Sequence, residues 1–230
     1  MHRLTLLLRF AGTIFFVIVF KLICYSLLTL GATRFGPTSL AAHNVLLRLF
    51  FFFATFGDSL SQSVQNFLPP IYAQDKTPLS KTFKQFERFH FLVAGAFSLV
   101  FSTAALFFLK GPGARLFSTD AAILASISAA APYLTAALVI HPPVMYLEGS
   151  IIAKRDVLFL LGSYIVTFGG LAGLVHGAGS LGGVWRAFVG YNAVRGAQFV
   201  VRYMLKRTSC GGVGDGKFGD DGCLMDSEIE

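Results

Sequence analysis

Long apolar runs recur along the chain, and polar stretches separate them. A helix rises ~1.5 Å per residue, so about 20 apolar residues cross the ~30 Å hydrocarbon layer of a membrane. Six segments reach this length or come close to it. The pattern predicts spanning helices over residues 5–31, 40–68, 89–109, 121–153, 157–175 and 181–205.

Proline, glycine and charged residues mark the ends of these segments. The pair Pro69–Pro70 lacks backbone donors and is expected to end the second helix. A polar connector over residues 71–88 and a tight turn at 111–113 flank the third span. Asp120 stands in cap position before the fourth span, and residues 154–156 form a very short loop to the fifth.

Two patterns bear on how the helices pack. Pro142 and Pro143 remove two backbone donors inside the fourth span, which a membrane tolerates only where the helix faces protein or water. They are therefore a candidate hinge. Gly169, Gly173 and Gly177 repeat at four-residue spacing, which is typical of a close helix contact.

Composition places the chain among all-α integral membrane proteins. Hydrophobic residues make up 54% of the 230 residues and charged residues only 13%, which excludes an ordinary soluble domain. The spacing of residues matches no metalloprotease, hydrolase or phosphate-loop motif and no zinc site, so we expect no enzyme activity, cofactor or metal. No basic and aromatic interleaving indicates nucleic acid.

Charge also predicts the orientation. Eleven basic residues fall on the side of the two termini and four on the other, so both termini are expected to face the cytosol or its equivalent. The excess of basic residues, a net charge of +7, fits anionic lipid headgroups. Residues 209–230 are glycine-rich and acidic and are predicted to be a disordered tail.

Asp58 is the main candidate for chemistry. It lies inside the second span, on a polar face with Ser61, Gln62 and Gln65 that cannot contact lipid. A shielded carboxylate can load and release a proton or cation, so Asp58 is the predicted coupling site. The alternative is a structural ion pair with Lys21 or Arg48.

The basic residues inside the spans indicate what else the helices handle. Lys21, Arg48 and Arg195 could line a substrate cavity together with Gln62 and Gln65, and three bases against Asp58 as the only acid well inside a span favour an organic anion. Internal pairing or headgroup anchoring is the alternative, and it is favoured for Arg195.

Glu148 and two histidines complete the candidate residues. Glu148, near residues 154–156, is predicted to act as a gate or a loop-locking salt bridge. A free histidine titrates near neutrality, so His43 and His141 could relay protons, although packing is the favoured interpretation for both.

Two stretches together carry a family resemblance. GPTSLAAHNVLLRLFFFFATFGDSLSQSVQNFLPP and the later LEGSIIAKRD resemble the carboxy-terminal six-helix lobe of the multidrug and toxic compound extrusion (MATE) transporters. The plant plastid branch is the most similar, with its LAAHQ, an acidic residue before LSQ, a Q-S-F-P-like close, and LEG with A-x-x-D. The match runs from the first span, with Lys21, through Arg195 in the last.

The resemblance implies one half of a twelve-helix antiporter that works by alternating access. Such a protein exports an organic solute in exchange for protons or sodium, and the branch implies the plastid envelope, with other membranes left open. The amino-terminal lobe is absent here, so the chain is expected to be a fragment, or a half-length protein that pairs with another lobe. From another class, a six-helix channel or a non-transporting membrane scaffold remains the alternative.

Overall fold

The computed structural model describes residues 2–75 and 80–211, and every regular element within them is a helix. Six α-helices and one short 3-10 helix follow one another. Their bounds are α1 His2–Thr33, α2 Gly36–Asp75, α3 Lys81–Lys110, η1 Pro112–Leu116, α4 Ala121–Ala153, α5 Val157–His176 and α6 Leu181–Gly211. The predicted all-α fold is confirmed.

Five of these helices, α1 to α5, are long and apolar enough to cross a membrane within the part of the chain that the structure describes. Large apolar side chains stay exposed along them, as on a surface that lipid covers; Phe107 and Leu99 are 75% and 69% exposed. The protein is therefore a multi-pass membrane protein. The sixth helix carries Arg186, Arg195 and Arg202, and its membrane crossing stays a prediction.

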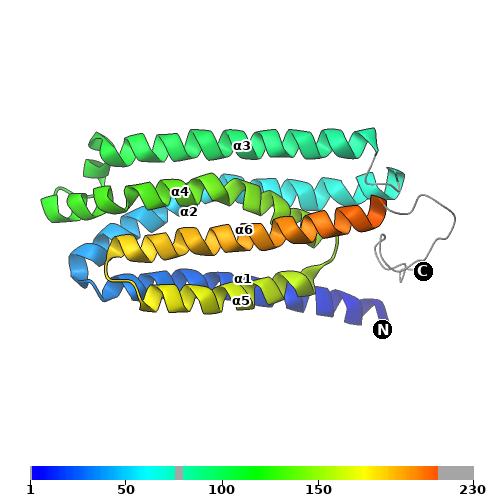
Figure 1. Ribbon diagram of the computed structural model, residues 1–230, viewed down its shortest axis with the longest axis horizontal. Coiled ribbons are helices and arrows are strands. Elements are labelled where there is room, and N and C mark those ends of the chain that lie inside the picture. Colours follow the sequence, from blue (N-terminus) through cyan, green and yellow to red (C-terminus); the bar gives the residue numbers. More distant parts are fainter. Residues whose placement is uncertain (1, 76–79, 212–230) are drawn as a thin grey trace.

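The helices run lengthwise beside one another, with α3 along one edge and α1 with α5 along the other (Figure 1). Helix α4 lies between them and packs against α2, α3 and α6, whereas α1 packs mainly on α5. Residues 144–151 of α4 are all buried, so this stretch is enclosed on every side. It forms the centre of the core.

The prediction that Pro69 and Pro70 end the second helix was wrong, since α2 continues through both to Asp75. These prolines remove only two donors, and their fixed φ is itself helical, so one further turn is tolerated near a helix end. The predicted connector over residues 71–88 is correspondingly shorter. Helix α3 begins at Lys81, where the Ser80 hydroxyl accepts a hydrogen bond from the Phe83 backbone N–H.

Pro142 and Pro143 lie inside the continuous helix α4 rather than in an interruption. Pro142 is buried and Pro143 half-buried, and the enclosed stretch 144–151 follows them. The expectation that such a pair must face protein is thus met. In Figure 1 the ribbon of α4 changes direction along its length.

Most of the predicted ends are confirmed. The Asp120 carboxylate accepts hydrogen bonds from the Ala122 and Ile123 backbone N–H groups, 2.7 and 3.4 Å away, and so caps α4. Only residues 154–156 separate α4 from α5. At the chain's other end α6 reaches Gly211, so residues 209–211 are helical rather than disordered. The rest of the predicted tail lies outside the described residues.

The close helix contact predicted at Gly169 and Gly173 is absent within the described chain, because a Cβ atom at either position would meet nothing within 4 Å. Gly177 instead forms the C-terminal cap of α5. The close approach lies at Gly149 of α4, where a Cβ would stand 2.6 Å from the backbone oxygen of Ser61 in α2. Helices α2 and α4 therefore touch backbone to backbone there.

Candidate functional site

An ion pair between α1 and α4 lies inside the bundle. The Lys21 ammonium is 3.3 Å from the Glu148 carboxylate, and the two side chains are 21% and 6% exposed. The Met145 sulfur lies 3.9 Å from the same ammonium. Lys21 near the middle of α1 thus finds its charge partner on α4 rather than at the membrane surface.

The ion pair continues through Tyr164 of α5 to Arg195 of α6. The Tyr164 hydroxyl donates a hydrogen bond to the second Glu148 oxygen at 2.8 Å and accepts one from the Arg195 guanidinium at 3.0 Å. Arg195 also donates to the Tyr191 hydroxyl at 3.1 Å and to the Asn192 side-chain oxygen at 3.4 Å. We call the following six residues the charged network: Lys21, Glu148, Tyr164, Tyr191, Asn192 and Arg195.

The guanidinium of Arg195 sits in a cage of aromatic rings. Its central carbon is 5.2 Å from the Tyr164 ring centre, 5.1 Å from Tyr191 and 6.0 Å from Phe199, distances at which ring faces attract cations. Arg195 is only 1% exposed. This enclosure supports internal pairing, the interpretation favoured for Arg195 from the sequence, rather than direct contact with a solute.

The charges of the network do not balance by themselves, because Lys21 and Arg195 face only one carboxylate, Glu148. Asp58 of α2 is half-buried and interacts electrostatically with all three groups. No hydrogen bond or ion pair links Asp58 to another described residue, so the predicted structural pair with Lys21 or Arg48 is absent. With Asp58 included, two acids face two bases, and protonation of Asp58 would leave a net positive charge.

One face of α2 is polar and exposed. Asn44, Arg48, Gln62 and Asn66 are all exposed, and their spacing places them on one side of the helix with Thr55 and Ser59. The Thr55 and Ser59 hydroxyls donate to backbone oxygens of α2 itself, but the amides and the guanidinium would be unsatisfied in lipid. This polar face of α2 must meet water or protein.

The structure gathers only some of the residues predicted for a substrate cavity. Gln62 and Asp58 lie on or beside the polar face of α2, and Gln65 is half-buried and donates to the Ser61 hydroxyl. Arg48 is exposed on the same face. Lys21 and Arg195 belong to the charged network instead. That these residues line one substrate cavity stays a prediction.

Both predicted histidines are buried. His43 lies 3.2 Å from the Thr29 hydroxyl, and its ring packs beside Trp185. The ring of His141 packs edge-on against Phe50, 5.2 Å between centres, and next to Gly57, where an added Cβ would be 2.9 Å from the imidazole. These contacts fit the packing interpretation for both residues.

Sequence reasoning missed three members of the charged network: Tyr164, Tyr191 and Asn192. Tyr164 stands between Ser163 and Thr167 in an otherwise apolar helix, and Tyr191, Asn192 and Arg195 are spaced to share one turn of α6. A buried tyrosine hydroxyl needs a hydrogen-bond partner, so a tyrosine in the middle of an apolar span signals a polar contact.

The loop-locking salt bridge exists, but Glu148 does not make it. Asp156, between α4 and α5, accepts a hydrogen bond from the Arg202 guanidinium at 2.7 Å and lies 3.1 Å from the Lys206 ammonium. Burial raises the pKa of the Asp156 carboxyl, but the hydrogen bonds and positive charges of both partners outweigh it, so the pKa lies below its usual 3.8. Asp156 thereby ties the short loop to the end of α6.

This loop bridge predicts a pH dependence that Asp156→Asn should remove. A carboxyl with a lowered pKa in the folded state stabilises that state while it is ionised, and the stabilisation fades as the pH falls through the folded-state pKa. We expect the wild type to melt at a higher temperature than Asp156→Asn at pH 7, and this difference to shrink as the pH falls below about 4. Thermal unfolding of both proteins in detergent micelles from pH 7 to pH 3 measures this difference in melting temperature. A difference that does not change with pH would contradict the prediction.

Comparison with protein-family models, with curated proteins and with solved structures found no match for this chain.

Proposed function

We propose that the chain is one lobe of a secondary active antiporter that exports an organic solute in exchange for protons or sodium. The observation that carries the proposal is the polar face of α2, which presents Asn44, Arg48, Gln62 and Asn66 outward on a helix long and apolar enough to cross a membrane. A non-transporting bundle surrounded by lipid would gain nothing from such a face. The MATE-like sequence stretches support the same conclusion.

Asp58 is the proposed coupling group, since it lies between the polar face and the charged network. Ion or proton binding there changes the charge that Lys21 and Glu148 experience. We propose that this weakens or strengthens the Lys21–Glu148 pair between α1 and α4, and that α4 rearranges about Pro142 and Pro143. Exchange then requires only that ion and solute favour different states of the lobe.

The polar face needs a partner surface, which we propose to be a second six-helix lobe. A water-filled path would lie between the two lobes, with Arg48, Gln62 and Gln65 toward the solute. Arg48 on that path is the remaining argument for an organic anion, because the charge of Lys21 is already paired with Glu148. The plastid envelope is the proposed membrane, on the family resemblance alone.

Asp58→Asn tests the proposal. In liposomes that contain the complete assembly carrying this chain, we expect the substitution to abolish solute exchange driven by a pH or sodium gradient while insertion and folding stay intact. Asp120→Asn is the matched control, because it removes one charge and keeps a good helix cap. Unchanged gradient-driven exchange in Asp58→Asn would exclude Asp58 as the coupling group.

The same liposomes separate the alternative functions. Saturable, gradient-coupled exchange supports the antiporter, and ohmic conductance would identify a channel instead. If the complete assembly carried no flux at all, a non-transporting membrane scaffold would be the remaining interpretation.

A further inference from the structure

A second cluster of charge lies away from the charged network, at the bundle end where α4 meets α5. A small, open pocket there has room at its floor for about one water-sized group. It is lined by Ser150, Ile151, Lys154, Asp156, Arg202, Tyr203 and Lys206. We call it the α4–α6 pocket. Its described lining residues include three basic side chains and one acid.

Two of the basic groups of the pocket are accessible and held in place. Arg202 and Lys206 both contact Asp156, yet their side chains remain 35% and 36% exposed. The Lys154 ammonium stands over the Tyr203 ring, 4.7 Å from its centre. One carboxylate thus positions two cations without neutralising them, and a third lies against the pocket's aromatic wall.

Tyr203 supplies a hydroxyl that lacks a partner. The residue is only 8% exposed, and no hydrogen-bond partner for its hydroxyl exists within the described residues. A buried hydroxyl without a partner costs free energy, so a ligand oxygen that enters the pocket would satisfy it. A hydroxyl donor beside several cations is the chemistry that recognises a phosphate group.

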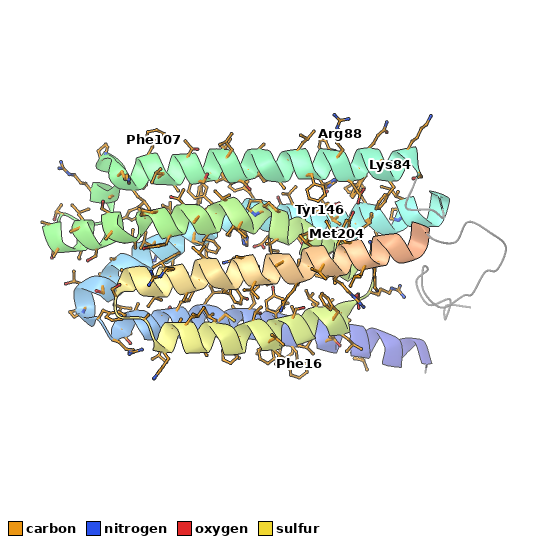
Figure 2. All side chains as sticks on the ribbon, in the orientation of Figure 1. Phe16, Lys84, Arg88, Phe107, Tyr146 and Met204 are labelled. Carbon is orange, nitrogen blue, oxygen red and sulfur yellow. The ribbon has the colours of Figure 1, made fainter. Side chains whose placement is uncertain are left out.

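The surroundings favour a lipid as the source of that phosphate. On α6, Val201, Met204 and Leu205 are 57%, 60% and 57% exposed beside the pocket residues in sequence, as on a helix surface that lipid covers. Lys84 and Arg88 project from α3 near the same end (Figure 2). Basic pockets between helices at the basic end of a membrane protein are suited to anionic headgroups.

We propose that the α4–α6 pocket binds the phosphate group of an anionic phospholipid, with the acyl chains in the surrounding lipid. Lys154, Arg202 and Lys206 provide the charge, and the Tyr203 hydroxyl donates to a phosphate oxygen. This site is independent of the proposed transport cycle and requires only that the protein lies in a membrane.

The test is the thermal stability of the purified chain in detergent micelles at pH 7 with increasing phosphatidylglycerol. We expect phosphatidylglycerol to raise the melting temperature at lower mole fractions than phosphatidylcholine. Lys206→Gln should raise the phosphatidylglycerol concentration needed for half of the effect about fivefold. Tyr203→Phe should raise it by a similar factor, about fivefold, through the lost hydrogen bond. Both variants keep the Asp156–Arg202 bond at 2.7 Å, so the fold is retained.

Arg186→Gln is the matched control, since it removes an exposed arginine near the opposite end of the same helix and should leave the lipid response unchanged. Equal stabilisation by phosphatidylcholine would overturn the proposal, as would an unchanged phosphatidylglycerol response in both Lys206→Gln and Tyr203→Phe. Full stabilisation by inorganic phosphate alone would overturn the assignment to lipid.

Discussion

Replacing Glu148 by Gln should destabilise the protein more than removing any other charge in the bundle. The substitution leaves Lys21 and Arg195 without their shared carboxylate, because Glu148 contacts Lys21 directly and Arg195 through the Tyr164 hydroxyl. Breaking a buried ion pair from one side costs roughly 3 kcal/mol or more. For a chain of this size that corresponds to a melting temperature lower by about 10 °C in detergent micelles.

A double-mutant cycle isolates the pair. Lys21→Met alone should cost less than Glu148→Gln, since Lys21 is at the partly exposed edge of the network and Glu148 retains Tyr164 and Arg195. In the Glu148→Gln background, Lys21→Met should cost much less than in the wild type or even stabilise, because it removes a buried charge without a partner. Strictly additive effects would show that the two residues do not depend on each other.

The number and position of the helices could be predicted from the sequence because a membrane requires long apolar segments with internally satisfied backbones. The charge partner of Lys21 could not be predicted in this way. Glu148 lies 127 residues away, and which acid faces Lys21 depends on how α1 and α4 are rotated against each other. From the sequence, Asp58 on α2 was the only partner considered for Lys21, as the alternative to its role as the coupling site.

One available signal did bear on Glu148. The prolines at 142 and 143 require an enclosed stretch of helix, and Glu148 follows within two turns in an apolar run. If the helix is enclosed from Pro142 through Glu148, then Glu148 is buried and needs a charge partner on another helix. It is then not a residue of the loop. It also corrects the view that Asp58 is the only acid well inside a span.

Glycine spacing was a weaker guide than glycine surroundings. Gly169 and Gly173 repeat at four residues, but α5 exposes them, whereas Gly149 belongs to no repeat and contacts α2 directly. A spacing pattern shows which glycines share a helix face. It does not show whether another helix covers that face.

Gly149→Ala should therefore prevent α2 and α4 from packing as they do. The added Cβ would lie 2.6 Å from the Ser61 backbone oxygen and 2.8 Å from its Cα, and since these are backbone atoms no side-chain rotation relieves the clash. Overpacking of this kind costs about 1–3 kcal/mol, or more where backbones must shift. Helix α2 carries Asp58, so under the proposed function gradient-coupled exchange should fall together with the melting temperature.

Gly95→Ala on α3 is the matched control, because a Cβ there meets nothing within 4 Å and alanine favours a helix over glycine by roughly 1 kcal/mol. It should melt at or above the wild-type temperature in detergent micelles. Ser61→Ala should not rescue Gly149→Ala, since it removes only the hydroxyl, 3.0 Å from the added Cβ, and leaves both backbone contacts. If Gly149→Ala melted at the same temperature as Gly95→Ala, the contact at Gly149 would not fix the distance between α2 and α4.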